Sequence, residues 1–247
     1  RVESAGNLLR LLGNNTKTLA KNEEGAFLFF ETPFAHYVLV DNDLRYYFNS
    51  ASSNAQLVTR LYAGIGKPLK NLGTLPFDKS FFGGGANGIR AWRARTLGPG
   101  TYTDTTGFTG VLNRIGDVQL EANIEYRFPI IRFLEGALFT DVGNIWVLNE
   151  KGSRTGTQFS SQFWRQVAIG SGVGLRLDFD FFIIRLDAGM QIHDPGLPEG
   201  ERWLWDDKTE YNAFINRYNE RNNRARNTLI PRYSTRINYN IGIGYPF

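Results

Sequence analysis

The sequence contains no cysteine, one methionine and only two histidines in 247 residues. The absence of cysteine excludes disulfides and thiolate metal ligands. His36 and His193 lie far apart and have no neighbouring ligand pattern, so we expect no metal site. No hydrophobic run approaches the roughly 20 residues that a membrane-spanning helix needs. This excludes helical spans only, because a spanning β-strand needs about 9 to 11 residues and shows as alternation.

Long blocks of one charge are also missing. The 28 Lys and Arg residues are interspersed with 24 Asp and Glu residues, which gives a net charge of +4. This mixture argues against nucleic-acid binding. The segment "GGGANG" at 83–88 lacks the Lys-Ser/Thr that follows in a phosphate-binding loop, and "GSGVG" at 170–174 places its serine wrongly for a hydrolase elbow. No pair of carboxylates is marked as acid and base, so we expect neither an enzyme nor a cofactor.

Aromatic residues and glycine are abundant: 27 Gly, 19 Phe, 11 Tyr and 5 Trp. This composition suits strands better than helices. From Asp117 to Phe128, polar and apolar residues alternate without a turn residue, and this length favours a membrane-spanning strand over a soluble one. Similar alternation recurs at 37–48, 57–66, 175–181, 184–190 and 236–247.

The connections between these strands alternate between short and long. Short ones are expected at about 49–54, 129–134 and 181–183, and long ones at about 11–33, 67–115, 147–165 and 193–233. This layout is typical of an outer-membrane barrel, whereas sandwiches with Greek-key connections do not show it. We therefore predict an all-β fold, a transmembrane antiparallel up-and-down β-barrel with its charged residues lining a wet lumen. In the alternative, a soluble carbohydrate-binding sandwich, the apolar face would meet a second sheet.

Several segments resemble the BamA/TamA superfamily of outer-membrane assembly factors. "LPFDKSFFGGGANGIRAWRARTLGPGTY" resembles the inward-folded loop before strand twelve, in which Gly-Gly precedes a Val/Ile-Arg-Gly-aromatic tetrad. The resemblance continues through "GDVQLEANIEYRFPI", "GALFTDVGNIW", "GVGLRLDFDFF", "IRLDAGMQIHDP" and "IGIGYPF". It is closest to the TamL-type branch, the lipoprotein relatives of TamA.

This resemblance implies that residues 1–247 are the C-terminal portion of a barrel domain. About eight strands of a probable sixteen would be present, with an inward-folded loop at about 70–115 and a long extracellular loop at about 193–233. Earlier strands and periplasmic POTRA domains are then expected upstream of Arg1. A self-contained eight-stranded barrel is the alternative.

The resemblance also implies a lumenal loop lock. The loop glycines Gly83, Gly84 and Gly85 precede the tetrad Ile89-Arg90-Ala91-Trp92, whose arginine would pair with Glu125 and Asp141. Enclosed guanidinium groups need charged, bidentate partners, which two acids would supply. Alanine replaces the usual glycine at position 91, and we expect it to fit if the position needs only a small side chain. Without the resemblance, Arg90, Arg93 and Arg95 would be interpreted as exposed loop charges.

The implied function is assembly, insertion or translocation of outer-membrane proteins through a lateral seam between the first and last strands. The last strand would be about Tyr233 to Phe247, and its backbone edge could pair with many clients because such pairing tolerates sequence. Implied partners are outer-membrane lipid, nascent outer-membrane proteins, and a TamB-like periplasmic protein or other assembly subunits, in a Gram-negative outer membrane. A polypeptide-secretion pore of the same superfamily or a passive channel is the alternative. The apolar face of the seam strand would comprise Ile237, Tyr239, Ile241, Ile243, Tyr245 and Phe247.

Overall fold

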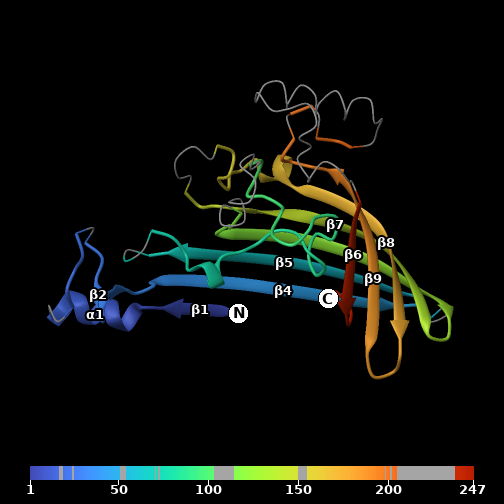
Figure 1. Cartoon of the computed structure of the whole chain (residues 1–247), viewed down its shortest axis with the longest axis horizontal. Coiled ribbons are helices and arrows are strands. Elements are labelled where there is room, and N and C mark those ends of the chain that lie inside the picture. The colour runs from blue at the N-terminus through green and yellow to red at the C-terminus, as the bar shows by residue number, and fades with distance from the viewer. Residues whose placement is uncertain are drawn as a thin grey trace, which may run out of the picture.

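The computed structural model describes residues 1–16, 19–23, 25–50, 54–69, 71, 73–102, 114–149, 155–197, 199–200, 202–204 and 237–247. Within them, one eight-stranded sheet has the order β1-β4-β5-β6-β7-β8-β9-β10 (Figure 1). A separate two-stranded hairpin joins β2 (Leu28–Phe29) to β3 (Thr32–Pro33). The strands of the large sheet are β1 (Val2–Ala5), β4 (Tyr37–Asn49), β5 (Gln56–Pro68), β6 (Val118–Ile131), β7 (Leu134–Trp146), β8 (Ala168–Asp178), β9 (Ile183–His193) and β10 (Ile237–Ile243).

The sheet is an antiparallel meander, as predicted. Neighbours in the sheet follow chain order, and β4 pairs with β5 along its whole length, from Tyr37 opposite Pro68 to Asn49 opposite Gln56. The strands from β4 to β9 contain 11 to 14 residues, which is long enough to cross a bilayer at a tilt. In the described part of the chain β1 and β10 do not pair, so the sheet is open and is not a closed eight-stranded barrel.

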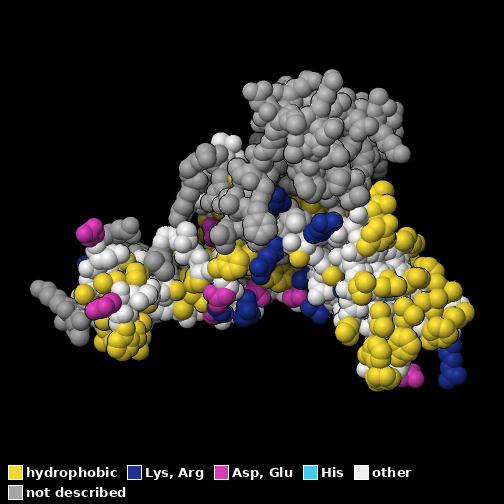
Figure 2. Space-filling model, in the orientation of Figure 1, with side chains coloured by type: hydrophobic (Ala, Val, Ile, Leu, Met, Phe, Trp, Pro, Cys, Tyr) yellow, Lys and Arg dark blue, Asp and Glu magenta, His cyan; other side chains and the backbone are white. Residues whose placement is uncertain are grey.

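The two faces of the sheet have opposite chemistry. On the outward face Leu61, Ile124 and Ile241 are 59%, 53% and 77% exposed, whereas on the inner face Arg60 and Glu125 are buried. Figure 2 shows hydrophobic side chains gathered over the β8–β9 hairpin, with charged side chains in the middle of the same view. Apolar residues outside and charges inside contradict the soluble sandwich, and they match a sheet whose outer face contacts lipid.

The tight turns differ in detail from the prediction. Only Arg132 and Phe133 separate β6 from β7, because both strands extend into the segment expected to connect them. The strand predicted to continue to Phe181 ends at Asp178. Asp180 has a φ of 67°, a left-handed backbone that reverses the chain and places Phe179 and Phe181 in the turn.

The predicted long connection at 11–33 overlaps helix α1 (Asn7–Thr16) and contains the β2–β3 hairpin. Leu8, Leu11 and Leu12 have the spacing of one helix face, which differs from the two-residue alternation of a strand. The helix follows Gly6, whose φ of +76° favours glycine. No helix in the described ranges is long and apolar enough to cross a membrane.

The C-terminal strand is shorter than predicted. It ends at Ile243, and Gly244 with a φ of 79° turns the chain toward the inner face. Phe247 is therefore 5% exposed and lies beside Arg90, not on the outward apolar face. Tyr245 also turns inward, because the Arg127 guanidinium lies 4.0 Å from the centre of its ring. Residues 233–236 lie outside the described part.

Two long connections carry short 3₁₀ helices, η1 (Phe77–Lys79) and η2 (Phe163–Gln166). The first connection, between β5 and β6, runs along the inner side of the sheet (Figure 1). In the predicted extracellular loop at 193–233, β9 extends to His193 and Trp203 bridges back to it. Residues 205–236, which include most of this predicted loop, lie outside the described residues.

Candidate functional site: a buried arginine cluster on the inner face

A glycine-rich turn directs the loop between β5 and β6 inward. Gly84 has a φ of +86°, and a Cβ there would lie 2.4 Å from the Arg93 carbonyl oxygen. The Gly85 N–H donates to the Trp92 carbonyl at 2.9 Å, and Gly83 forms a bridge with Leu97. The segment from Gly83 to Leu97 therefore folds back on itself, and it carries the tetrad at its tip.

Arg90 is fully buried and makes a bidentate ion pair with Asp141 on β7. Its Nε and Nη2 each donate to a carboxylate oxygen of Asp141 at 2.9 Å, and its backbone N–H donates to the same carboxylate at 3.0 Å. Nη1 donates to Glu125 on β6. The guanidinium carbon lies 3.5 Å from the centre of the Phe139 ring, which supports the planar group from one side. The structure thus brings together three residues that are distant in sequence.

The pairing extends well beyond these three residues. Glu125 also accepts from Arg127 at 2.7 Å and lies 3.1 Å from Arg176. Asp187 accepts from Arg176 at 2.6 Å and lies 3.2 Å from Nε of Arg185. We call this set the lumenal charge cluster: Arg90, Arg127, Arg176, Arg185, Glu125, Asp141 and Asp187. The cluster carries four cations and three anions.

Sequence reasoning missed most of this cluster. Arg185 and Asp187 lie in the alternating segment at 184–190, whose charged residues are predicted to line the lumen, but this prediction does not show which strands approach one another. In the register of β8 with β9, Arg176 lies opposite Arg185. These two guanidinium groups and that of Arg90 surround the carboxylates of Glu125 and Asp187. The available signal was the shared polar face of β6, β8 and β9.

Ala91 packs against two glycines of the barrel wall. It is buried, and its φ does not lie in the left-handed region. A Cβ on Gly170 of β8 would lie 2.4 Å from the Ala91 methyl, and one on Gly189 of β9 would lie 2.9 Å from the Ala91 nitrogen. The Ala91 carbonyl accepts from Gln191 at 3.3 Å. Position 91 therefore requires a small side chain. The residues of β8 and β9 that face Ala91 are glycines, which leave room for its methyl group.

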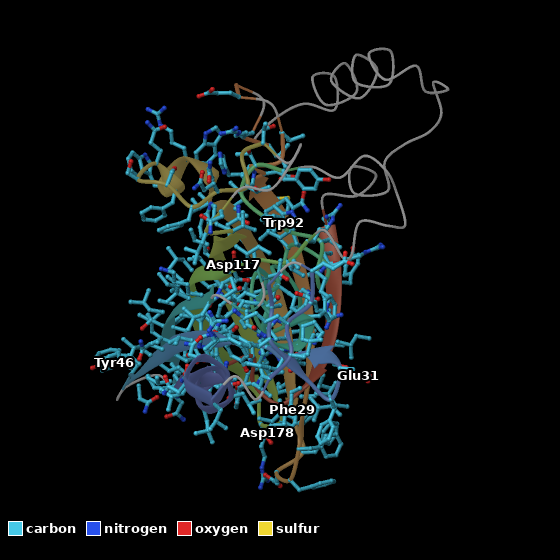
Figure 3. The ribbon with its side chains drawn as sticks, turned by 90° about the vertical axis from the view of Figure 1, so that its left-hand side faces the viewer. Phe29, Glu31, Tyr46, Trp92, Asp117 and Asp178 are labelled. Carbon is cyan, nitrogen blue, oxygen red and sulfur yellow. The ribbon has the colours of Figure 1, made fainter. Side chains whose placement is uncertain are left out.

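Ile89 and Trp92 flank this contact on the buried side of the loop. Both pack in one apolar cluster with Leu97 and with Ala168 at the start of β8. Trp92 and Asp117 lie toward one end of the sheet, and Asp178 lies near the opposite end (Figure 3). The tetrad therefore contributes a buried arginine at its centre and apolar anchors on both sides.

Moving the methyl group from position 91 in the loop to position 170 on β8 tests the contact between these two residues. We expect Gly170→Ala to destabilise the barrel by about 1–3 kcal/mol, because its Cβ would overlap the Ala91 methyl. Ala91→Gly removes that methyl, so the Gly170→Ala/Ala91→Gly double variant should recover most of the loss. Urea titration followed by unheated gel electrophoresis reports the folded fraction. Equal losses in the Gly170→Ala and double variants would contradict the contact.

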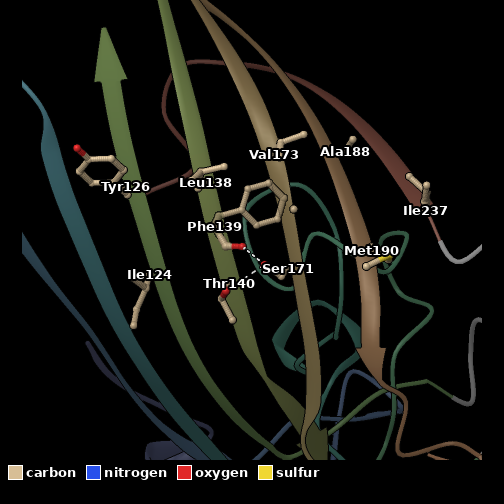
Figure 4. A pocket seen from close by; sticks show the side chains of 11 residues that line it. Ile124, Tyr126, Leu138, Phe139, Thr140, Ser171, Val173, Ala188, Met190 and Ile237 are labelled. Atoms are coloured by element: carbon tan, nitrogen blue, oxygen red, sulfur yellow. Dashed lines mark hydrogen bonds between the residues drawn. The ribbon is translucent and has the colours of Figure 1, made fainter. Parts of the chain in front are cut away.

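The outward face of the same strands carries a shallow groove of about 530 Å³ (Figure 4). Its polar floor consists of Thr140 and Ser171, whose hydroxyls lie 3.1 Å apart, and Ser171 also donates to the Phe139 carbonyl at 2.7 Å. Hydroxyl groups that face lipid need such internal partners. The groove is otherwise lined by apolar side chains, among them Ile124, Tyr126, Leu138, Val173, Met190 and Ile237.

Within the described residues no group of three or more potential ligands could hold a metal ion. Four buried arginines and three acids on four strands and one loop can hold a loop in place, and they can release it only by separating paired charges.

Several solved structures are partly similar to the chain, among them a BamA and a CdiB. BamA from Haemophilus ducreyi lacking POTRA domains 1–3 has 17% identity and a TM-score of 0.49, over 63% of this chain and 32% of that chain. CdiB from Acinetobacter baumannii has 18% identity and a TM-score of 0.42, over 68% of this chain and 25% of that chain. The chain thus spans about a third and a quarter of their lengths.

No curated protein matches the chain. The model of the Omp85 superfamily domain, in contrast, matches residues 30–243. This match includes every strand from β4 to β10 and both sides of the lumenal charge cluster. Proteins of this superfamily reside in outer membranes and act in transport and assembly. Because the match covers most of the sequence, the chain belongs to the Omp85 superfamily.

Proposed function

We propose that this chain is the seam-bearing C-terminal part of an outer-membrane assembly factor, most similar to the TamL-type branch. It inserts nascent outer-membrane proteins by pairing with them along β10, without covalent chemistry or a cofactor. The loop lock, consisting of Ile89, Arg90, Ala91, Trp92, Glu125 and Asp141, holds the inward loop while this occurs. A TamB-like periplasmic protein or other assembly subunits would deliver the clients, and outer-membrane lipid would surround the outward apolar face.

The free edge of β10 is the observation that supports this proposal. β10 pairs with β9 from Ile237 opposite Met190 to Ile243 opposite Ile184, and on its other side the described residues provide no partner. The Gly244 N–H donates to the Ile183 carbonyl, so alternate residues in register, such as Gly242, point their N–H toward β9. Ile241 therefore points its N–H away from β9, along the free edge. A client strand can pair there by backbone hydrogen bonds.

Proline at position 241 tests the edge directly. Ile241→Pro removes one N–H from the free edge and leaves the pairing with β9 intact, and edge strands tolerate proline in this arrangement. We expect it to slow client insertion by about tenfold, since a missing donor leaves a client carbonyl unpaired. The measurement uses the full-length protein in liposomes with a urea-denatured small outer-membrane barrel as client. The folded client is scored by its gel mobility before and after heating.

Ile241→Ala is the matched control, because it also removes the outward side chain but keeps the N–H. It should insert clients at nearly the wild-type rate. Equal rates for the proline and alanine variants would contradict pairing at this edge. A polypeptide-secretion pore predicts transport through the lumen that is insensitive to either change. A passive channel predicts no client insertion by the wild type.

A further inference from the structure

The carbonyl oxygen of Arg90 is bonded to the seam strand. Asn238 and Asn240 lie two residues apart on β10, and the Nδ2 group of each donates to this oxygen at 2.9 Å. Both asparagines alternate with the outward Ile237, Tyr239 and Ile241, so they belong to the inner face of the strand. Two side chains of β10 therefore share one acceptor in the loop.

The side chain of the same arginine is bonded to the two central strands of the described sheet. Its guanidinium pairs with Asp141 on β7 and Glu125 on β6, while β8 and β9 lie between these strands and β10. A bidentate ion pair fixes both the position and the orientation of the guanidinium plane. Because this ion pair fixes the side chain of Arg90, it also restricts the position of the Arg90 carbonyl, to which β10 is bonded.

Two further contacts bring β10 and the loop together. A Cβ on Gly242 would lie 2.7 Å from Nη2 of Arg185, so this glycine lets the arginine lie close beneath the strand. The same Nη2 donates to the Asn87 side chain in the loop at 2.9 Å. Beyond Gly244, the Phe247 ring lies 5.5 Å from the Arg90 guanidinium. The loop thus meets β10 and the residues that follow it at several points.

We infer that Asn238 and Asn240 are positioning residues that tie the seam strand to the seated loop. Seating of the loop in the lumen and ordering of β10 are then coupled equilibria, in which each favours the other. Withdrawal of Arg90 from Asp141 removes the acceptor of both asparagines at once. The inference rests on the proposed function only in assigning β10 as the client-binding edge, and the coupling itself can be measured without a client.

Hydrogen–deuterium exchange of the full-length protein in lipid nanodiscs tests this coupling. In Arg90→Ala we expect amides of the loop at 85–92 and amides of β10 both to exchange about tenfold faster or more, because both sets of contacts are lost. In Asn238→Ala/Asn240→Ala the β10 amides should accelerate about tenfold, and the loop should accelerate less because its ion pair with Asp141 remains. Arg90→Lys, which keeps the charge but cannot make the bidentate pair, provides the same comparison if the alanine variant does not fold.

Tyr239→Ala is the matched control on β10, because Tyr239 points outward and is 76% exposed. It should leave exchange in the loop at 85–92 unchanged. The inference would be overturned if, in Arg90→Ala or Arg90→Lys, the loop amides exchanged faster while the β10 amides exchanged at the wild-type rate. Failure of the proposed function is distinguishable: the exchange pattern would then hold while Ile241→Pro inserts clients normally, and β10 would be coupled to the loop without serving as the client edge.

Discussion

Replacing Arg90 with alanine should lower the free energy of unfolding of the barrel by about 3–5 kcal/mol, the usual loss when one partner of a buried ion pair is removed. Asp141 loses its charged partner, and its remaining side-chain partner in the described structure is the neutral Asn123, at 2.9 Å. Glu125 keeps Arg127 and Arg176. The loss therefore comes mainly from one uncompensated carboxylate on β7.

Urea titration read by unheated gel electrophoresis measures this loss, and client insertion should fall with it. Arg93→Ala is the matched control, because Arg93 lies in the same loop and is exposed. Neutralising the stranded acid should rescue part of the stability, so Arg90→Ala/Asp141→Asn should be more stable than the sum of its single variants predicts. Arg90→Ala with the stability and activity of Arg93→Ala would exclude a role for the loop lock.

Glu125→Ala should be at least as destabilising as Arg90→Ala, with a loss of about 3–5 kcal/mol or more. Glu125 pairs with three arginines of the lumenal charge cluster: Arg90, Arg127 and Arg176. Its removal leaves four arginines and two acids, so mutual repulsion of the guanidinium groups adds to the lost pairing. Arg127 would lose the acid with which it pairs in the described structure.

Glu125→Gln separates charge from shape, because it keeps the side-chain volume and removes only the negative charge. We expect Glu125→Gln to be nearly as unstable as Glu125→Ala, because both variants lack the negative charge. Glu199→Gln, at an exposed position, is the control for the loss of one carboxylate. Unfolding midpoints in urea provide the comparison. A Glu125→Gln variant as stable as Glu199→Gln would show that the cluster does not depend on this charge.

The strands could be predicted because alternation has a period of two and each strand repeats it for many residues. Faces were therefore assigned correctly along β5, β6 and β9. Register could not be predicted, because it depends on how two strands slide past each other. This is why the alternation at 175–181 and 184–190 predicts charged residues in the lumen but does not connect Arg176 and Asp187 with Arg90.

Departures from the predicted fold occur where a single residue changes the backbone direction. Gly244 and Asp180 have left-handed φ values of 79° and 67°, and each ends a strand whose pattern of side chains continues. Phe247 and Phe181 thus keep the spacing of a strand without being part of one. The contact of Arg90 with Glu125 and Asp141 was named through the resemblance, since nothing in composition or periodicity joins a loop to two particular strands.

The aromatic side chains of the turn between β8 and β9 help to fix the depth of the sheet in the membrane. Phe179 and Phe181 lie exposed at one end of the sheet, and Trp164 in η2 lies exposed beyond the start of β8, at the other end. Aromatic rings favour the two boundaries of a bilayer, so these residues set the height of the sheet along the membrane normal. The lumenal charge cluster then lies level with the hydrocarbon layer. Because the potential of charged headgroups falls off within a Debye length of the surface, we expect these ion pairs to depend little on the surface charge of the membrane.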